Sequence, residues 1–178
     1  MLHGIKSLNP TTKNETAVDL LVGCHDRIRN FTSVVRKLAH AEGSTLEEIS
    51  TAASSAHRYF TVSLPLHEAD EEESLRPRLR ENGSAEIVAA LNAMTHQHHG
   101  IDDLVERLIP ILVLLSSNPA KLPEVHGEMC SLSKALDEVF RGHLDLEETV
   151  LFPAVSNRLS PVEQGAMLAE MKQRRKQG

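Results

Sequence analysis

The sequence HLDLEETVLFPAV at residues 143–155 repeats the pattern of HEADEEESLRPRL at residues 67–79. Both stretches follow H-x-x-x-E-E-x-x-L-x-P-x-[LV], so a histidine, two glutamates, a leucine and a proline recur at the same spacing. In an α-helix, residues four positions apart lie one above the other on one face, about 6 Å apart along the axis. Each stretch is therefore expected to present one histidine and one glutamate on the same face of a helix.

A shorter pattern precedes each of these two stretches. Residues 25–31 (HDRIRNF) and 98–104 (HHGIDDL) share H-x-x-I-x-x-[FL]. The first of these histidines stands 42 residues before the histidine of 67–79, and the second stands 45 residues before that of 143–155. The chain is thus predicted to be an internal two-fold repeat. Each half is a helix with one histidine, followed by a helix with a histidine and a glutamate.

The composition favours a single helical domain with an aliphatic core. The chain has 178 residues, of which 40% are hydrophobic and 25% are charged, as is typical of one soluble globular domain. It contains no tryptophan, one tyrosine and four phenylalanines, but ten histidines. The alternation of β-branched residues that predicts strands is absent. We therefore expect a core of Leu, Val, Ile and Ala side chains from helices.

Charge and hydropathy argue against several kinds of partner. The net charge is −6, and no basic patch is interleaved with aromatic residues, so we expect no nucleic-acid partner. No apolar run approaches the roughly 20 residues of a membrane-spanning helix. Residues 1–15 lack the apolar core of a signal peptide, so a cytoplasmic location without membrane contact is expected. Cys24 and Cys130 form neither a disulfide framework nor a CxxC site.

Start and stop signals divide the chain into four long helices and one short helix. Capping boxes at residues 12–15 and 44–47 start the first two helices, and Ser84 caps the third. The first three are expected to end near Ala41, between residues 77 and 83, and at Ser117. The fourth is expected to begin between residues 119 and 123 and to end near residue 157, and the capping box at residues 160–163 opens the fifth.

Short connections between long helices imply antiparallel neighbours. We predict an all-α fold, an up-down-up-down four-helix bundle with a short C-terminal fifth helix. The predicted divisions are an N-terminal arm (residues 1–14), the bundle (residues 15–158), and a short helix with a basic tail (residues 159–178). Pro65, Pro110 and Pro153 are expected to bend their helices, because each removes a backbone donor.

Apolar neighbours place the repeated polar residues in the interior of the bundle. Phe60, Leu64 and Leu75 share the helical stripe of His67, and equivalent apolar residues flank the other repeated histidines. That stripe is the one that a bundle helix buries. The residues expected to converge in the core are His25, His67, Glu71, His98, His143 and Glu147.

This set of donors predicts a metal centre. Two buried carboxylates repel each other, and each would cost several kcal/mol without a positive partner. Six ligands exceed the needs of one tetrahedral zinc ion. They suit two octahedral-type ions, each with two histidines and bridged by both glutamates. Imidazole with carboxylate favours iron, with manganese or zinc as substitutes, and unfilled positions leave room for dioxygen, nitric oxide or an oxo bridge.

Other histidines compete for a place in this site. His96 and His99 flank His98, and the spacing to Ile101 and Leu104 favours His98. His57 lies on the stripe of His67 but has no counterpart in the second half, so core packing or support of the ligands is the favoured role. His3, His40 and His126 fit no pattern and are expected to be surface residues.

Three further features are interpreted as structural. Cys24 adjoins His25 but points about 100° away from it on a helix, so a buried thiol is favoured over a ligand. The acidic run at residues 68–73 is expected to be a solvated face apart from Glu71. The basic tail at residues 172–176 is expected to be solvated and mobile.

The residues from His25 to Val155 resemble the hemerythrin-like family, also called the HHE cation-binding domain. The resemblance rests on the repeated H-x-x-x-E-E pattern and on the Leu-Phe-Pro ending of the second copy, which is typical of that family. It implies a four-helix bundle around a non-haem di-iron centre. Oxygen-carrying members have a pair of histidines four residues apart on the third helix, whereas Met94 and Asp102 stand at those distances from His98.

The set of four histidines and two glutamates is more similar to the iron-cluster repair proteins of this family, which are linked to nitrosative and oxidative stress. Those proteins carry an additional N-terminal segment with a cysteine, which has no counterpart here. The leading hypothesis is a di-iron protein that binds, senses or detoxifies dioxygen, nitric oxide or peroxide. The alternatives are an iron donor or peroxide-decomposing enzyme using the same centre, and a non-catalytic helical protein with a structural metal. Whether the chain is an enzyme, and which protein partner it has, stay open.

Overall fold

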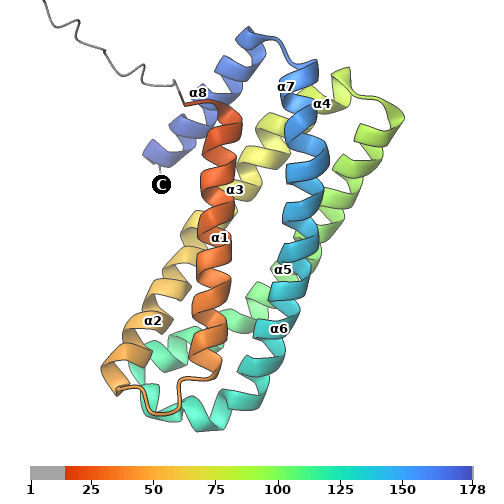
Figure 1. Cartoon of the computed structure of the whole chain (residues 1–178). Helices are drawn as coiled ribbons and strands as arrows, with labels where there is room; N and C mark the ends of the chain where they lie inside the picture. The colour runs from red at the N-terminus through yellow and green to blue at the C-terminus, as the bar shows by residue number, and fades with distance from the viewer. Residues whose placement is uncertain (1–14, 178) are drawn as a thin grey trace, which may run out of the picture.

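A computed structural model describes residues 15–177 and shows an antiparallel four-helix bundle with a fifth helix against one end (Figure 1). No strand occurs within the described residues. The second and fourth arms of the bundle are each built from several consecutive helical segments. The first and third arms are α1 (Ala17–Ala39) and α5 (Ala85–Ser117), and the fifth helix is α8 (Pro161–Gln177). The second arm comprises α2 (Leu46–Arg58), η1 (Tyr59–Ser63), α3 (Leu64–Ala69), η2 (Asp70–Leu75) and α4 (Arg76–Asn82). The fourth arm comprises η3 (Pro119–Lys121), α6 (Leu122–Leu146), η4 (Glu147–Leu151) and α7 (Phe152–Arg158). The predicted fold class is confirmed.

Side-chain caps define where most of the arms begin. Thr16 caps α1 in a capping box with Asp19, while the box predicted at residues 12–15 lies outside the described residues. The box predicted at residues 44–47 is wrong by one residue, because Thr45 and Glu48 form it. Both positions satisfy the S/T-x-x-E pattern, so the pattern alone does not separate them. The caps predicted at Ser84 and at residues 160–163 are confirmed.

Prolines coincide with wider turns in the second and fourth arms. The π-helical segments η1, η2 and η4 are followed by Pro65, Pro77 and Pro153, each at the second residue of the next α-helical segment. A proline has no amide hydrogen for the i to i−4 hydrogen bond, and its ring clashes with the carbonyl of residue i−4. The wider π turn relieves that clash. In η2 and η4, the carbonyls of Glu71 and Glu147 accept the i to i−5 bonds. The helix α5 stays α-helical through Pro110.

The core consists of two aliphatic clusters, one toward each end of the bundle. One joins the C-terminal part of α1 to α2, to the C-terminal half of α5 and to α6. The other joins the N-terminal parts of α1 and α5 to α4, α7 and α8. Along α1, Cys24 belongs to one cluster and Ile28 to the other, with His25 between them. Along α5, His98 separates Met94 from Ile101 in the same way. The repeated histidines therefore occupy the gap between the two apolar clusters.

The prediction that residues 172–176 are a solvated, mobile tail is wrong for Arg174 and Arg175, which hold the helix α8 against Asp70, whereas Lys172, Gln173 and Lys176 are exposed. Arg174 Nη1 lies 2.9 Å from Asp70 Oδ1, and Arg175 Nη2 lies 2.6 Å from Asp70 Oδ2. Asp70 is fully buried, so the acidic run is not a solvated face at this residue either. The sequence could not reveal this contact, because it joins residues more than 100 positions apart.

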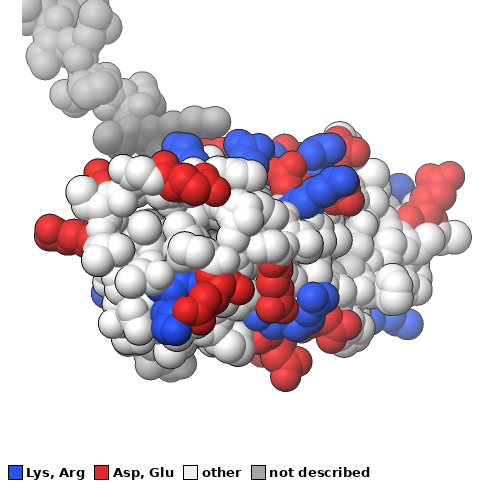
Figure 2. Space-filling view, turned by 90° about the horizontal axis from the view of Figure 1, so that it is seen from below, with Lys and Arg blue, Asp and Glu red and all other residues white. Residues whose placement is uncertain are grey.

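The face of the molecule that is seen from below carries side chains of both charges. None of the described helices is long and apolar enough to cross a membrane. Figure 2 shows lysine and arginine side chains interspersed with aspartate and glutamate on that face.

Arg175→Ala should destabilise the fold, because it leaves the buried carboxylate of Asp70 with one partner fewer. Breaking a buried ion pair typically costs about 3–5 kcal/mol. Because Arg175 is partly exposed, we expect a loss of about 2–3 kcal/mol in the free energy of unfolding, measured by denaturant titration at fixed metal content. The control is Lys172→Ala on the same helix, which breaks an exposed pair with Glu15 and should cost less than about 1 kcal/mol. Equal losses in the two variants would contradict the assigned role of Asp70.

Candidate metal centre

The structure brings the six predicted residues together in the middle of the bundle. They come from all four arms, and their side chains are between 0% and 6% exposed. Their donor atoms form two groups, in each of which one atom from every residue lies within 4.8 Å of the others. One group contains His25, His67, Glu71 and Glu147, and the other contains Glu71, His98, His143 and Glu147. The histidines of each half of the repeat therefore belong to one group, and both glutamates belong to both.

The carboxylate of Glu71 faces the two groups with different oxygens. Its Oε1 lies 3.0 Å from His67 Nε2 and 3.9 Å from His25 Nε2. Its Oε2 lies 3.1 Å from His98 Nε2. The i, i+4 pairing of His67 with Glu71 that the sequence predicts is thus present.

Glu147 does the same from the opposite arm. Its Oε2 lies 3.0 Å from His25 Nε2, and its Oε1 lies 3.3 Å from His143 Nε2. Each carboxylate thus turns one oxygen toward each group, which is the arrangement that a bridging carboxylate requires.

Several of these atoms are close to one another without forming hydrogen bonds. His25 Nε2, His67 Nε2, Glu71 Oε1 and both carboxylate oxygens of Glu147 are buried and have no hydrogen-bond partner of acceptable geometry. Buried polar atoms are rarely left in this state. A cation between the groups would satisfy their lone pairs and supply the missing positive charge. The donor set, two imidazole nitrogens and two carboxylate oxygens for each group, therefore fits two metal ions of the iron or manganese type.

The four imidazoles respond differently to the carboxylates. Burial alone would lower the pKa of His25, but the nearby carboxylates of Glu147 and Glu71 raise that pKa to about 10. Burial likewise opposes protonation of His98, and its contacts with Glu71 raise its pKa to about 9. Burial prevails at the other two histidines and lowers the pKa of His67 to about 4 and that of His143 to about 3.

The two glutamates are pushed in opposite directions. Burial would raise the pKa of Glu71, but the neighbouring His67, His25 and His98 hold it well below its usual range. Burial and the negative charge of Glu71 raise the pKa of Glu147 to about 8. Without metal ions, protons on His25, His98 and Glu147 would therefore offset the negative charge of the site. Metal ions would supply that positive charge in place of the protons.

The second glutamate of each repeated pair supports a histidine of the other half. Glu148 Oε1 lies 2.8 Å from His25 Nδ1, and Glu72 Oε1 lies 2.9 Å from His98 Nδ1. A carboxylate on Nδ1 holds the ring in place and leaves Nε2 directed at the metal groups. The sequence interpretation did not assign these glutamates a role, although the repetition of Glu-Glu in both copies was the signal for them. Gln97 Oε1 lies 3.2 Å from His143 Nδ1, whereas His67 Nδ1 has no partner.

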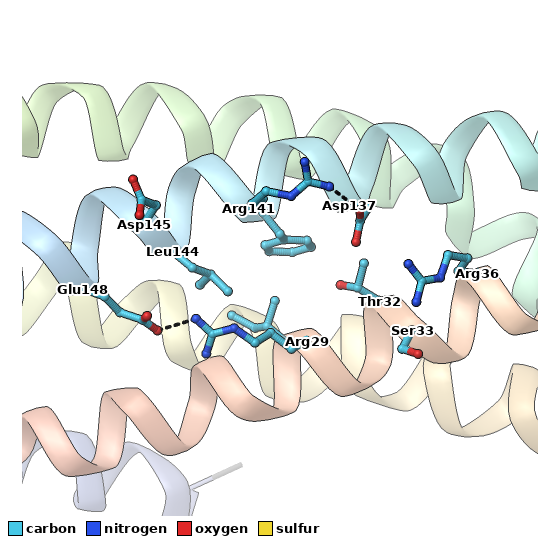
Figure 3. Close-up of a pocket in the computed structure, with 11 residues that line it drawn as sticks. Arg29, Thr32, Ser33, Arg36, Asp137, Arg141, Leu144, Asp145 and Glu148 are labelled. Atoms are coloured by element: carbon cyan, nitrogen blue, oxygen red, sulfur yellow. Dashed lines mark hydrogen bonds and ion pairs between the residues drawn. The ribbon is translucent and has the colours of Figure 1, made fainter.

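A groove between α1 and α6 reaches this outer layer of the site. It has a volume of about 340 Å³ and an apolar floor that includes Ile28, Phe140 and Leu144. At one end, Arg29 Nη2 lies 2.6 Å from Glu148 Oε1 (Figure 3). The same carboxylate oxygen thus contacts both the guanidinium and His25. The ring of Phe152, from the Leu-Phe-Pro ending, packs on His25 with centroids 5.0 Å apart.

The competing residues lie outside both donor groups. His96 and His99 are exposed and belong to neither group, whereas the buried His98 belongs to one of them. His57 is half-buried and belongs to neither group, and His3 lies outside the described residues. Cys24 is buried but contacts Arg27 and Arg175 instead of the donor groups, as expected for a thiol that points away from the site.

The chain matches a known protein family over most of its length. The sequence model of a protein family described as "Hemerythrin HHE cation binding domain" matches residues 16–155. No curated protein and no solved structure matches the chain.

Glu71→Ala and Glu147→Ala should each abolish binding of both metal ions, because each carboxylate faces both donor groups. His67→Ala and His143→Ala, which remove a donor from a single group, should lower the metal content less. The measurement is metal analysis of the purified variants by mass spectrometry. His57→Ala and His99→Ala are the controls and should keep the wild-type content. Full retention of two metal ions in Glu147→Ala would refute the ligand assignment.

Glu148→Gln should weaken metal binding while leaving the six donors in place, because the neutral amide supports His25 less strongly than a carboxylate. Losing such a partner typically lowers metal affinity by roughly 10- to 100-fold, and we expect a value in this range from competition with a chelator. Glu72→Gln should act in the same way through His98. The matched control is Glu138→Gln, an exposed residue on α6. Unchanged affinity in both Glu72→Gln and Glu148→Gln would exclude this supporting role.

Proposed function

Because the chain belongs to the hemerythrin HHE cation-binding family, we propose that its central site holds two non-haem iron ions and binds, senses or detoxifies a small ligand. The ligands that suit such a centre are dioxygen, nitric oxide and peroxide. The observation that carries the proposal is the pair of overlapping donor groups that share both Glu71 and Glu147. A cytoplasmic location and a role in oxidative or nitrosative stress are parts of the same proposal.

In this proposal, each half of the repeat supplies the histidines of one ion. His25 and His67 would hold one ion, His98 and His143 would hold the other, and Glu71 and Glu147 would each offer an oxygen to both. Each ion then has four protein donors, fewer than the six of octahedral coordination. Iron, when bound, supplies the redox chemistry and the open positions at which a small molecule can coordinate.

The residues around the centre limit what can reach it. The six donor side chains are at most 6% exposed, and apolar clusters lie on both sides of them along the bundle. This packing favours a ligand of a few atoms over a larger substrate.

Iron is preferred to the alternatives because of the donor set. Two imidazoles with carboxylates are typical of non-haem iron and manganese sites, and no thiol takes part in either group. Manganese or zinc can occupy such donors, so metal identity is part of what the test must establish.

The iron-loaded protein, reduced under anaerobic conditions, should change its visible absorption when it meets dioxygen or nitric oxide, because ligand binding at iron creates charge-transfer bands. The measurement is anaerobic absorption spectroscopy with iron content determined on the same sample. His99→Ala, one residue from His98, should respond like the wild type. A protein with two iron ions and no response to dioxygen, nitric oxide or peroxide would overturn the proposal and leave a structural role for the metal.

A further inference from the structure

The groove between α1 and α6 has the features of a small-molecule site, and the function proposed for the iron centre does not use it. Its volume of about 340 Å³ lies at the lower end of the roughly 300–1,000 Å³ that is typical of such sites. An apolar floor with a few polar groups around it is also typical of them. None of the residues that line the groove is among the six donors of the metal centre. The groove is therefore a separate place at which a molecule can bind.

Thr32 of α1 lines this groove with a hydroxyl that has no hydrogen-bond partner. The residue is 4% exposed, and its Oγ1 is one of the buried polar atoms that are left unsatisfied. A threonine in a helix can donate its hydroxyl to the carbonyl four residues back, as three others in this chain do, namely Thr61, Thr95 and Thr149. Thr32 does not. Since buried polar atoms are rarely left unpaired, its hydroxyl is available to a molecule in the groove.

Arg36, one turn after Thr32 on α1, is a second group of the groove without a partner. It forms no ion pair with any residue between 15 and 177, the part of the chain that the structure describes. The other two arginines of the groove are each paired with a carboxylate at 2.6 Å, Arg29 with Glu148 and Arg141 with Asp137. Figure 3 shows the side chain of Arg36 extending toward Thr32. An anion that binds here therefore has one free guanidinium and one free hydroxyl to contact.

The two ends of the groove differ in charge. One end contains two guanidiniums and one carboxylate, those of Arg36, Arg141 and Asp137. The other end contains one guanidinium and two carboxylates, those of Arg29, Glu148 and Asp145. Figure 3 shows the carboxylate of Asp145 pointing away from the apolar floor. A single negative charge is therefore favoured at the end that holds Arg36 and is disfavoured at the other.

The apolar floor lies between these two ends. Arg29 and Arg36 are seven residues apart on α1, which corresponds to about 10 Å along the helix axis. That distance is close to the length of a medium-chain fatty acid. The floor, formed by Ile28, Phe140 and Leu144, offers such a chain an apolar surface along which to lie.

We propose that this groove binds a small monocarboxylic acid with an unbranched apolar chain, of which octanoate is a representative. The carboxylate accepts hydrogen bonds from the guanidinium of Arg36 and the hydroxyl of Thr32, and the chain lies along the floor toward Arg29. Hydrogen bonds between a guanidinium and a carboxylate are among the stronger ones in proteins. One carboxylate matches the single excess positive charge of that end. This site is independent of the function proposed for the iron centre.

Octanoate is the probe, titrated into the iron-loaded full-length protein and followed by isothermal titration calorimetry. We expect saturable binding of one octanoate per chain. Octylamine has the same chain but a positive head group, and acetate has the carboxylate without the chain. Each should bind at least roughly tenfold more weakly, because one meets Arg36 with the wrong charge and the other buries almost no apolar surface. Equal affinity for either compound would contradict the proposed mode of recognition.

Two variants locate the carboxylate in the groove. Arg36→Gln should weaken octanoate binding roughly tenfold, and Thr32→Val, which keeps the shape of the side chain, should weaken it roughly three- to tenfold. The matched control is Lys37→Gln, which removes the same charge from the next residue, an exposed one outside the groove, and should keep the wild-type affinity. Unchanged iron content and helical circular dichroism show that each variant is folded.

Two outcomes would overturn the proposal. One is the absence of octanoate binding to the wild type. The other is an affinity that is unchanged in both Arg36→Gln and Thr32→Val, as coordination of the carboxylate by the metal would give.

Discussion

Two carboxylates buried side by side are the constraint on which the rest of this structure depends. Glu71 and Glu147 are both 0% exposed and share the same four imidazole neighbours. Two such charges repel each other and lose their hydration, at a cost of several kcal/mol per ion. One imidazole from each arm contacts them, in the gap between the two apolar clusters of the core. The opposite pKa shifts of the two glutamates show the same conflict, which two metal cations between them would resolve.

The repeat also accounts for local backbone geometry. In both copies the metal-facing glutamate opens or lies within a π turn, and a proline follows in the next α-helical segment. The symmetry is incomplete, however. His143 Nδ1 contacts Gln97, but the residue in the equivalent position of the first half is Cys24, and His67 Nδ1 has no partner. The two donor groups are thus alike in their metal-facing atoms and different in what supports them.

The sequence predicts the architecture and the six donors because both depend on periodicity. Histidine and glutamate four residues apart, within an apolar stripe, determine a helix face without reference to the rest of the chain. The contacts that it does not predict are those that depend on how the arms pack. The sequence does not predict that Thr45, and not Ser44, caps the helix, because both residues have a glutamate three positions later. The pairing of Asp70 with Arg174 and Arg175, and that of Glu148 with His25, join residues that only the assembled bundle brings together.

The crossed support of the histidines has a consequence for how the chain is organised. His25 of the first half is held by Glu148 of the second, and His98 of the second half is held by Glu72 of the first. Each half also contributes a carboxylate that faces the other half's histidines. A single helical hairpin taken alone would keep its own pair of imidazoles but would lose both the outer carboxylate of one ring and one of the two bridging groups. The smallest self-sufficient unit is therefore two hairpins. A change in either hairpin alters the surroundings of the histidines in both donor groups.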